Sequence, residues 1–179
     1  MAVTINGPIN SFNLPAGPSG ITSSSNGQIL YVSFQQVSGL SFYVSTNNGV
    51  NWSEIIAPNV TNGNFTNLGC NGDGTIIYAT WIGGALCYSL NSGSTWTYFP
   101  STDLGNGQST DFLVGVALDS TGTKILACTN TYVFTSTNSG ANWTSSPVFT
   151  SNPGGINAVV ACSRDFTTRY AVFNNNIYK

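Results

Sequence analysis

The chain has 179 residues, of which 41% are hydrophobic, 12% aromatic and only 6% charged, with a formal net charge of −2. This length suits one domain that buries about 70% of its unfolded surface. Four Lys and Arg residues are too few for the basic stripe that binds nucleic acid. The longest apolar stretch, around Phe112 to Leu118, is far shorter than the roughly 20 residues of a membrane-spanning helix, so we expect neither nucleic-acid binding nor membrane insertion.

Four stretches along the chain share one pattern: a short strand, a polar turn and a second strand. Their second strands are nearly continuous in apolar and β-branched residues, which is typical of strands covered on both faces. The four stretches are Ile21 to Ser33, Leu68 to Thr80, Val116 to Cys128 and Val160 to Val172.

The polar turn of these stretches carries glycine in three copies. Gly27, Gly74 and Gly122 occupy the same place, and the fourth copy has Phe166 there. Glycine supplies a positive φ at little steric cost. We therefore expect the turn at Phe166 to be of a different type.

A third strand follows in each unit, beginning at Leu40, Ala85, Tyr132 and Asn176, and an octapeptide follows the first three of these. The octapeptide is Ser-x-Asn-x-Gly-x-x-Trp, read as STNNGVNW, SLNSGSTW and STNSGANW. Its Asn tolerates left-handed backbone angles and can bond the backbone two residues on, and its Trp begins a fourth strand with a ring to bury. The pattern predicts a structural role for Asn47, Gly49, Trp52, Asn91, Gly93, Trp96, Asn138, Gly140 and Trp143.

The octapeptide resembles the Asp-box, or bacterial neuraminidase repeat, of sialidase-like β-propellers, with Asn in place of the usual Asp. Four strands in about 45 residues is also the size of a propeller blade. One domain over residues 1–179 is expected, with blades at approximately 20–57, 66–100, 113–150, and 157–179 together with 3–15. Similar repeats build photosystem assembly factors, which have more blades and a basic patch that this chain lacks.

The ends of the chain decide how the blades close. The fourth unit reaches Lys179 without an outer strand, and Val3 to Phe12 looks like a degraded turn with Phe12 in the Trp position. We predict an all-β fold: a small four-bladed β-propeller of four-stranded antiparallel blades, its ring closed by an N-terminal strand that completes the last blade. The alternative is an open arc of four units that completes a larger ring by oligomerising.

The resemblance also implies where a ligand binds. In that family the octapeptide turns lie opposite the binding entrance, which is built by the turns between second and third strands. Aromatic rings beside amides there would suit a neutral sugar, although Phe34 and Trp81 could instead pack on neighbouring blades. The candidate ligand-binding residues are Phe34, Gln36, Trp81, Asn130, Tyr132 and Asn174.

Catalytic residues are not expected. Sialidase chemistry needs three arginines, a Tyr–Glu pair and an acid, whereas this chain has Arg164, Arg169 and a single Glu54. Asp103 and Asp111, on one polar connection, are the candidate carboxylate pair for glycoside hydrolysis. Without histidine, a Ser or Cys nucleophile lacks its usual base.

Metal ligands and cofactors are not expected either. The cysteines lack the paired spacing of a metal site and are interpreted as buried, reduced thiols. Three aspartates share the polar turns and are interpreted as turn formers, because one carboxylate per turn falls short of the six to eight oxygens that calcium requires. These residues are Cys70, Cys87, Cys128, Cys162, Asp73, Asp119 and Asp165.

These observations favour a non-catalytic binding or structural module that presents one face to a protein or glycan partner and could assemble into a larger complex. A lectin-like propeller and a glycoside hydrolase are the alternatives. The uncharged polar composition favours an extracellular, cell-surface or virion location, although MAVTINGP at the N-terminus lacks the regions of a secretory signal.

Overall fold

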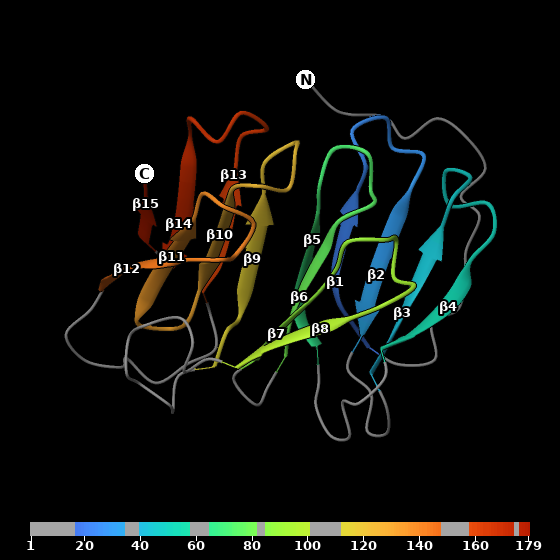
Figure 1. The fold of residues 1–179 in the computed structure, drawn as a ribbon, viewed down its shortest axis with the longest axis horizontal. Coiled ribbons are helices and arrows are strands. Elements are labelled where there is room, and N and C mark those ends of the chain that lie inside the picture. Colours follow the sequence, from blue (N-terminus) through green and yellow to red (C-terminus); the bar gives the residue numbers. More distant parts are fainter. Residues whose placement is uncertain are drawn as a thin grey trace.

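The fold is all-β (Figure 1). The computed structural model describes residues 17–34, 40–57, 65–81, 85–100, 112–147, 158–173 and 176–179. Over these ranges the chain forms strands and turns, and none of it forms a helix that could cross a membrane.

The strands form four antiparallel sheets in chain order, each sheet being one blade. Blade one contains β1 (Pro18–Ser23), β2 (Leu30–Phe34), β3 (Leu40–Ser45) and β4 (Ser53–Ala57). Blade two contains β5 (Phe65–Cys70), β6 (Ile77–Trp81), β7 (Ala85–Ser89) and β8 (Thr97–Pro100). Blade three contains β9 (Gly115–Leu118), β10 (Ile125–Cys128), β11 (Tyr132–Ser136) and β12 (Thr144–Pro147), and blade four contains β13 (Val159–Cys162), β14 (Arg169–Phe173) and β15 (Asn176–Tyr178).

This architecture confirms the predicted four-bladed propeller of antiparallel blades. Three blades have four strands, and the described part of blade four has three. Residues 3–15, predicted to supply its outer strand, lie outside the described residues, so the closure of the ring stays a prediction.

The second strands are the most buried elements, as their composition predicts. β6 and β10 are buried along their whole length, and β2 is buried from its second residue onward. β14 differs, because Arg169 and Tyr170 at its start are exposed. The core therefore lies between the blades, and fewer residues of the second strand are buried in blade four than in the other blades.

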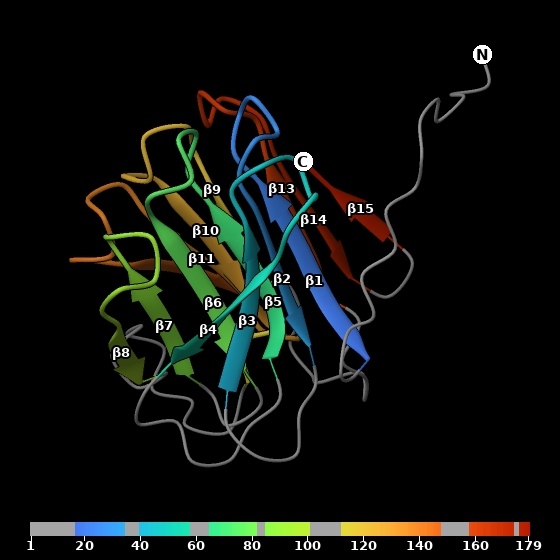
Figure 2. The same cartoon turned by 90° about the vertical axis from the view of Figure 1, so that its right-hand side faces the viewer.

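The hydrophobic core consists of three clusters, one for each pair of successive blades. The first joins Tyr31 and Phe42 of blade one to residues such as Leu68 of blade two. The second joins blades two and three, and the third joins blades three and four. The inner strands β1, β5, β9 and β13 pack in that order, and Figures 1 and 2 show the sheets stacked face to face in this succession.

The turn at Phe166 is of the same type as its counterparts, so the expectation of a different type is wrong. Phe166 has a φ of 65°, close to the 70° of Gly27. Its N–H donates to the carbonyl of Ser163 at 2.9 Å, as the N–H of Gly27 does to that of Ser24 at 3.0 Å. Burial of the ring explains why the strain is tolerated: Phe166 is 7% exposed within the third cluster, and the Arg169 guanidinium lies over it.

Candidate functional site

Hydrogen bonds inside each octapeptide turn hold its shape. In blade three, the Ser136 hydroxyl donates to Oδ1 of Asn138 at 3.0 Å and accepts the N–H of Gly140 at 2.9 Å. Oδ1 of Asn138 also accepts the N–H of Asn142 at 2.9 Å. Blades one and two repeat these contacts at 2.8 to 3.0 Å.

The backbone of the octapeptide differs from the expectation in one respect. The left-handed non-glycine residue is the one after Asn, namely Asn48, Ser92 or Ser139, with φ between 56° and 59°. The Asn oxygen binds an N–H four residues on rather than two. The Asn is therefore an acceptor that closes the turn, and the next residue and Gly take the left-handed angles.

Two of the three octapeptide Trp rings, those of Trp96 and Trp143, join neighbouring blades. Trp96 stacks on Phe42 of blade one with ring centroids 4.9 Å apart, and its Nε1 donates to the carbonyl of Gly93. Trp143 packs in the cluster between blades two and three. Its Nε1 is buried and has no hydrogen-bond partner among the described residues, whereas Trp52 Nε1 donates to Gly49 at 3.0 Å.

A second set of turns, between the first and second strands of each blade, is joined by a ladder of backbone hydrogen bonds. The Ser25 N–H donates to the Gly72 carbonyl at 2.7 Å, Gly72 to Ser120 at 2.8 Å, and Ser120 to Arg164 at 2.8 Å. We call this series the turn ladder. It links all four blades at the same end as the octapeptides.

A polar cavity of about 210 Å³ lies beside the turn ladder, lined by residues that include Cys70, Asp119, Cys162 and Arg164. Both oxygens of Asp119 accept hydrogen bonds within its own turn, from the Lys124 N–H and the Thr121 hydroxyl. This arrangement agrees with the interpretation of Asp119 as a turn former.

The cysteine thiols beside this cavity are poor nucleophiles and metal ligands. Burial, followed by the Asp119 carboxylate, raises the pKa of Cys162 to about 11. Burial also raises the pKa of the Cys70 thiol. The thiolate is the reactive form, and no group of three His, Cys, Asp or Glu residues in the described part of the chain could hold a metal ion.

The predicted ligand-binding residues that the structure describes lie at the opposite end of the blades, where second strands end and third strands begin; they are Phe34, Trp81, Asn130 and Tyr132. Phe34 is 1% exposed and Trp81 is 8% exposed, so both rings pack mainly against protein. Tyr132 is half-buried beside the second cluster. Gln36 and Asn174, like the candidate acids Asp103 and Asp111, lie outside the described residues.

Asn130 is the predicted site residue with an unusual environment. It lies between β10 and β11, flanked by the buried residues Thr129 and Thr131. Its Oδ1 atom is buried and has no hydrogen-bond partner among the described residues. A buried acceptor without a donor costs about 1 to 3 kcal/mol. Because the atom is buried, a ligand could supply the donor only after the segment between β10 and β11 moves to expose it.

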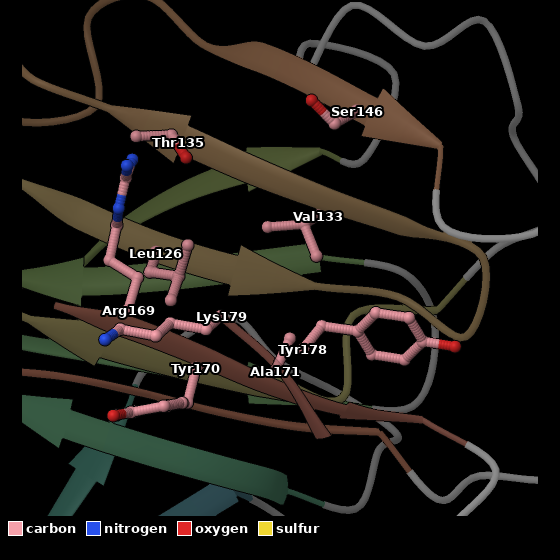
Figure 3. A pocket seen from close by; sticks show the side chains of 9 residues that line it. All are labelled: Leu126, Val133, Thr135, Ser146, Arg169, Tyr170, Ala171, Tyr178 and Lys179. Atoms are coloured by element: carbon pink, nitrogen blue, oxygen red, sulfur yellow. The ribbon is translucent and has the colours of Figure 1, made fainter. Parts of the chain in front are cut away.

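A second cavity, of about 250 Å³, lies between blades three and four (Figure 3). Leu126 and Val133 line it from blade three, and Ala171 and Tyr178 from blade four. The strand register aligns Val133 with Phe42, the residue that Trp96 covers. The cavity therefore lies where an outer strand of blade four would place its ring, a position for which the sequence predicts Phe12.

Comparison with known proteins assigns the chain to the β-propellers by fold. No protein-family model matches it, and no curated protein is significantly similar to it in sequence. An ancestral GH74 enzyme superposes with a TM-score of 0.69 and 18% identity, over 91% of this chain and 22% of that enzyme. YCF48 bound to D1 peptide superposes with a TM-score of 0.61 and 12% identity, over 92% of this chain and 54% of YCF48.

The β-propeller domain of Swd1 from Myceliophteria thermophila superposes with a TM-score of 0.64 and 9% identity, over 86% of this chain and 48% of that domain. The chain thus spans between 22% and 54% of the length of these three structures. These similarities include an enzyme and a peptide-bound protein, so they define a fold on which both activities occur.

Proposed function

We propose that this propeller is a non-catalytic interaction module that binds a protein partner at the end of the blades opposite the octapeptide turns. A cell surface, a virion or a secreted assembly is the proposed setting. The octapeptide end would be the scaffold, because its Ser and Asn side chains already bond within their own turns.

The unpaired Oδ1 of Asn130 carries this proposal. Peptide backbones supply N–H donors. Once a movement of the segment between β10 and β11 exposes the Asn130 oxygen, pairing with such a donor recovers a cost that the free protein bears. Tyr132, two residues on, adds an aromatic side chain that is half-buried rather than fully enclosed. YCF48, which has this fold, is a propeller seen with a peptide bound, and this supports a protein segment as the ligand.

The test is selection of binding peptides from a displayed random library, followed by titration of the selected peptides. We expect Asn130→Ala to weaken binding by about tenfold, the equivalent of 1.4 kcal/mol. Its melting temperature should stay the same or rise, because the unpaired acceptor is removed. Val50→Ala, at an exposed position of the blade-one octapeptide, is the control and should bind as the wild type does.

Two other outcomes would replace the proposal. Binding to a glycan array, lost in Trp81→Ala and without any peptide binding, would identify a lectin-like propeller. Hydrolysis of a glycoside that disappears in Asp103→Asn or Asp111→Asn would identify a glycoside hydrolase. The GH74 enzyme of similar fold is the reason to include the second assay.

We also propose that the octapeptide is an Asp-box in which Asn replaces Asp. Oδ1 of Asn138 acts only as an acceptor, from the Ser136 hydroxyl and the Asn142 N–H, and a carboxylate oxygen could do the same. We expect Asn138→Asp to change the free energy of unfolding by less than about 0.5 kcal/mol. Asn138→Leu should cost about 1 to 3 kcal/mol, and equal losses in the two variants would contradict the proposal.

A further inference from the structure

The face that each blade turns toward the next one carries the same buried positions. Tyr31 and Phe42 hold these positions in blade one, and Tyr78 and Leu86 hold them in blade two; each is 1% exposed. The two phenols donate across the interface, Tyr31 to the Gly74 carbonyl at 2.8 Å and Tyr78 to the Ser139 carbonyl at 3.1 Å. A blade following in the stack is what buries these residues.

Blade four exposes the same positions. Strand register aligns Tyr170 with Tyr31 and Ile177 with Phe42. Tyr170 is 41% exposed and Ile177 is 74% exposed. Val159, which pairs across the sheet with Val172 beside Ile177, is 53% exposed. We call this surface the blade-four face.

Blade one exposes apolar residues on the opposite face, around Val32 and Phe34, which lie on the same side of the sheet and are buried. Ile21 is 69% exposed, whereas its counterparts are packed against the preceding blade: Leu68 at 4%, Val116 at 4% and Val160 at 7%. Ile56 on β4 is 68% exposed and lies on the same side of the sheet. We call this surface the blade-one face. Surfaces of this type cover the facing blade in each of the three internal interfaces, where the facing blade presents Tyr31, Tyr78 or Leu126.

The turn ladder ends at the same two blades. Within the described residues it begins with the Ser25 N–H and has its last rung at the Arg164 carbonyl. By the pattern of the ladder, the next rung would run from the Arg164 N–H to a residue in the position of Ser25. The blade-four and blade-one faces therefore match in both apolar positions and backbone groups.

We propose that a second copy of this chain covers these surfaces head to tail, the blade-four face of each copy packing on the blade-one face of the other. Two such contacts close a dimer of eight blades. The argument for a second copy is continuity: each contact would repeat the packing of the three internal interfaces. Because the contact is heterologous, the two surfaces of one copy are different and can be altered separately.

Sedimentation velocity on the full chain tests the proposal. The wild type should be a dimer, and Ile21→Asp and Tyr170→Asp should each be monomeric, because a buried unpaired carboxylate should raise the dissociation constant by about 100-fold or more. Leu90→Asp, at an exposed position of the blade-two octapeptide, should remain dimeric. Matching melting temperatures of the two monomeric variants would show that both are folded.

Mixing the two monomeric variants gives the sharper result. Ile21→Asp keeps an intact blade-four face and Tyr170→Asp keeps an intact blade-one face, so the mixture should recover a dimer held by one contact. A mixture that stays monomeric would overturn the head-to-tail arrangement. A monomeric wild type whose melting temperature falls in both variants would overturn the dimer and show closure within one chain, as predicted for residues 3–15.

Discussion

Phe166 holds a left-handed backbone angle in a turn where the other three blades have glycine. A non-glycine residue in this region costs on the order of 1 kcal/mol. The ring offsets the cost because it is 7% exposed in the cluster between blades three and four. Backbone strain and core packing therefore oppose each other at one residue.

This opposition predicts an unusual order of variants. Phe166→Ala and Phe166→Gly both lose the buried ring, at about 3 to 5 kcal/mol, but only glycine relieves the strain. We expect the glycine variant to be the more stable by about 1 kcal/mol in urea unfolding. At Val160, a buried strand residue of the same cluster, alanine should be better than glycine; the same order at both sites would contradict the strain.

The carboxylate of Asp165, next to Phe166, predicts a pH dependence. Hydrogen bonds from the Ser163 hydroxyl and from the N–H and hydroxyl of Thr167 lower its pKa to about 2. Because the unfolded value is near 4, its stabilisation is present above about pH 4 and is lost as the pH falls through about 2. The melting temperature of Asp165→Asn should therefore fall less than that of the wild type between pH 4 and pH 2, and parallel curves would refute this.

At the scale of the element, the turn between the first and second strands of each blade also forms hydrogen bonds to the same turn of the neighbouring blade. The turn ladder passes from Ser25 through Gly72 and Ser120 to Arg164. Gly72 allows the turns to approach closely, because a Cβ atom there would lie 2.8 Å from the Ser120 carbonyl oxygen and 2.9 Å from the Ser25 hydroxyl. Atoms of the neighbouring blades therefore occupy the space that a side chain at Gly72 would need.

Gly72→Ala should therefore weaken the backbone hydrogen bonds that residue 72 makes with Ser25 and with Ser120. We expect a loss of about 1 to 3 kcal/mol in the free energy of unfolding, with faster hydrogen exchange at the amides of Ser25 and of residue 72, which donate the two hydrogen bonds on either side. Gly17→Ala is the matched control, because a Cβ atom at Gly17 would meet nothing within 4 Å. Unchanged exchange at both amides in Gly72→Ala would show that the turns yield without cost.

The sequence predicts the strands well because the octapeptide sets their order and register. The outer strands begin at Ser53, Thr97 and Thr144, each directly after its Trp. Residue spacing does not decide whether Phe34 and Trp81 are buried, since an aromatic residue at a strand end suits a core or a ligand equally. The burial of the Asn130 Oδ1 atom without a partner depends on the conformation of the chain at Thr129 and Thr131. Residue spacing does not predict that conformation.

At the scale of the whole molecule, the stacking of blades means that equivalent residues in different blades contribute differently to the free energy of unfolding. Trp96 stacks on Phe42 of the preceding blade. Trp52, in the first blade, belongs to none of the three clusters formed by the described residues. Its contribution to stability depends on what covers the blade-one face.

We expect Trp96→Ala to cost about 3 to 5 kcal/mol, which at this size lowers the melting temperature by about 2 to 4 °C for each kcal/mol. The measurement is urea unfolding. Val50→Ala, at an exposed position of the blade-one octapeptide, is the control and should change the free energy of unfolding by less than about 0.5 kcal/mol. A loss in Trp96→Ala no larger than that in the control would contradict the stacking of Trp96 on Phe42.

The rungs between neighbouring turns join amide to carbonyl, atoms that every residue other than proline possesses. A joint of this kind is indifferent to which side chains sit beside it, so a gene segment encoding one blade could be duplicated, lost or exchanged without first evolving a matching pair of side chains. Hydrogen bonds between main-chain groups therefore permit the differences in amino-acid sequence that are seen among the four units.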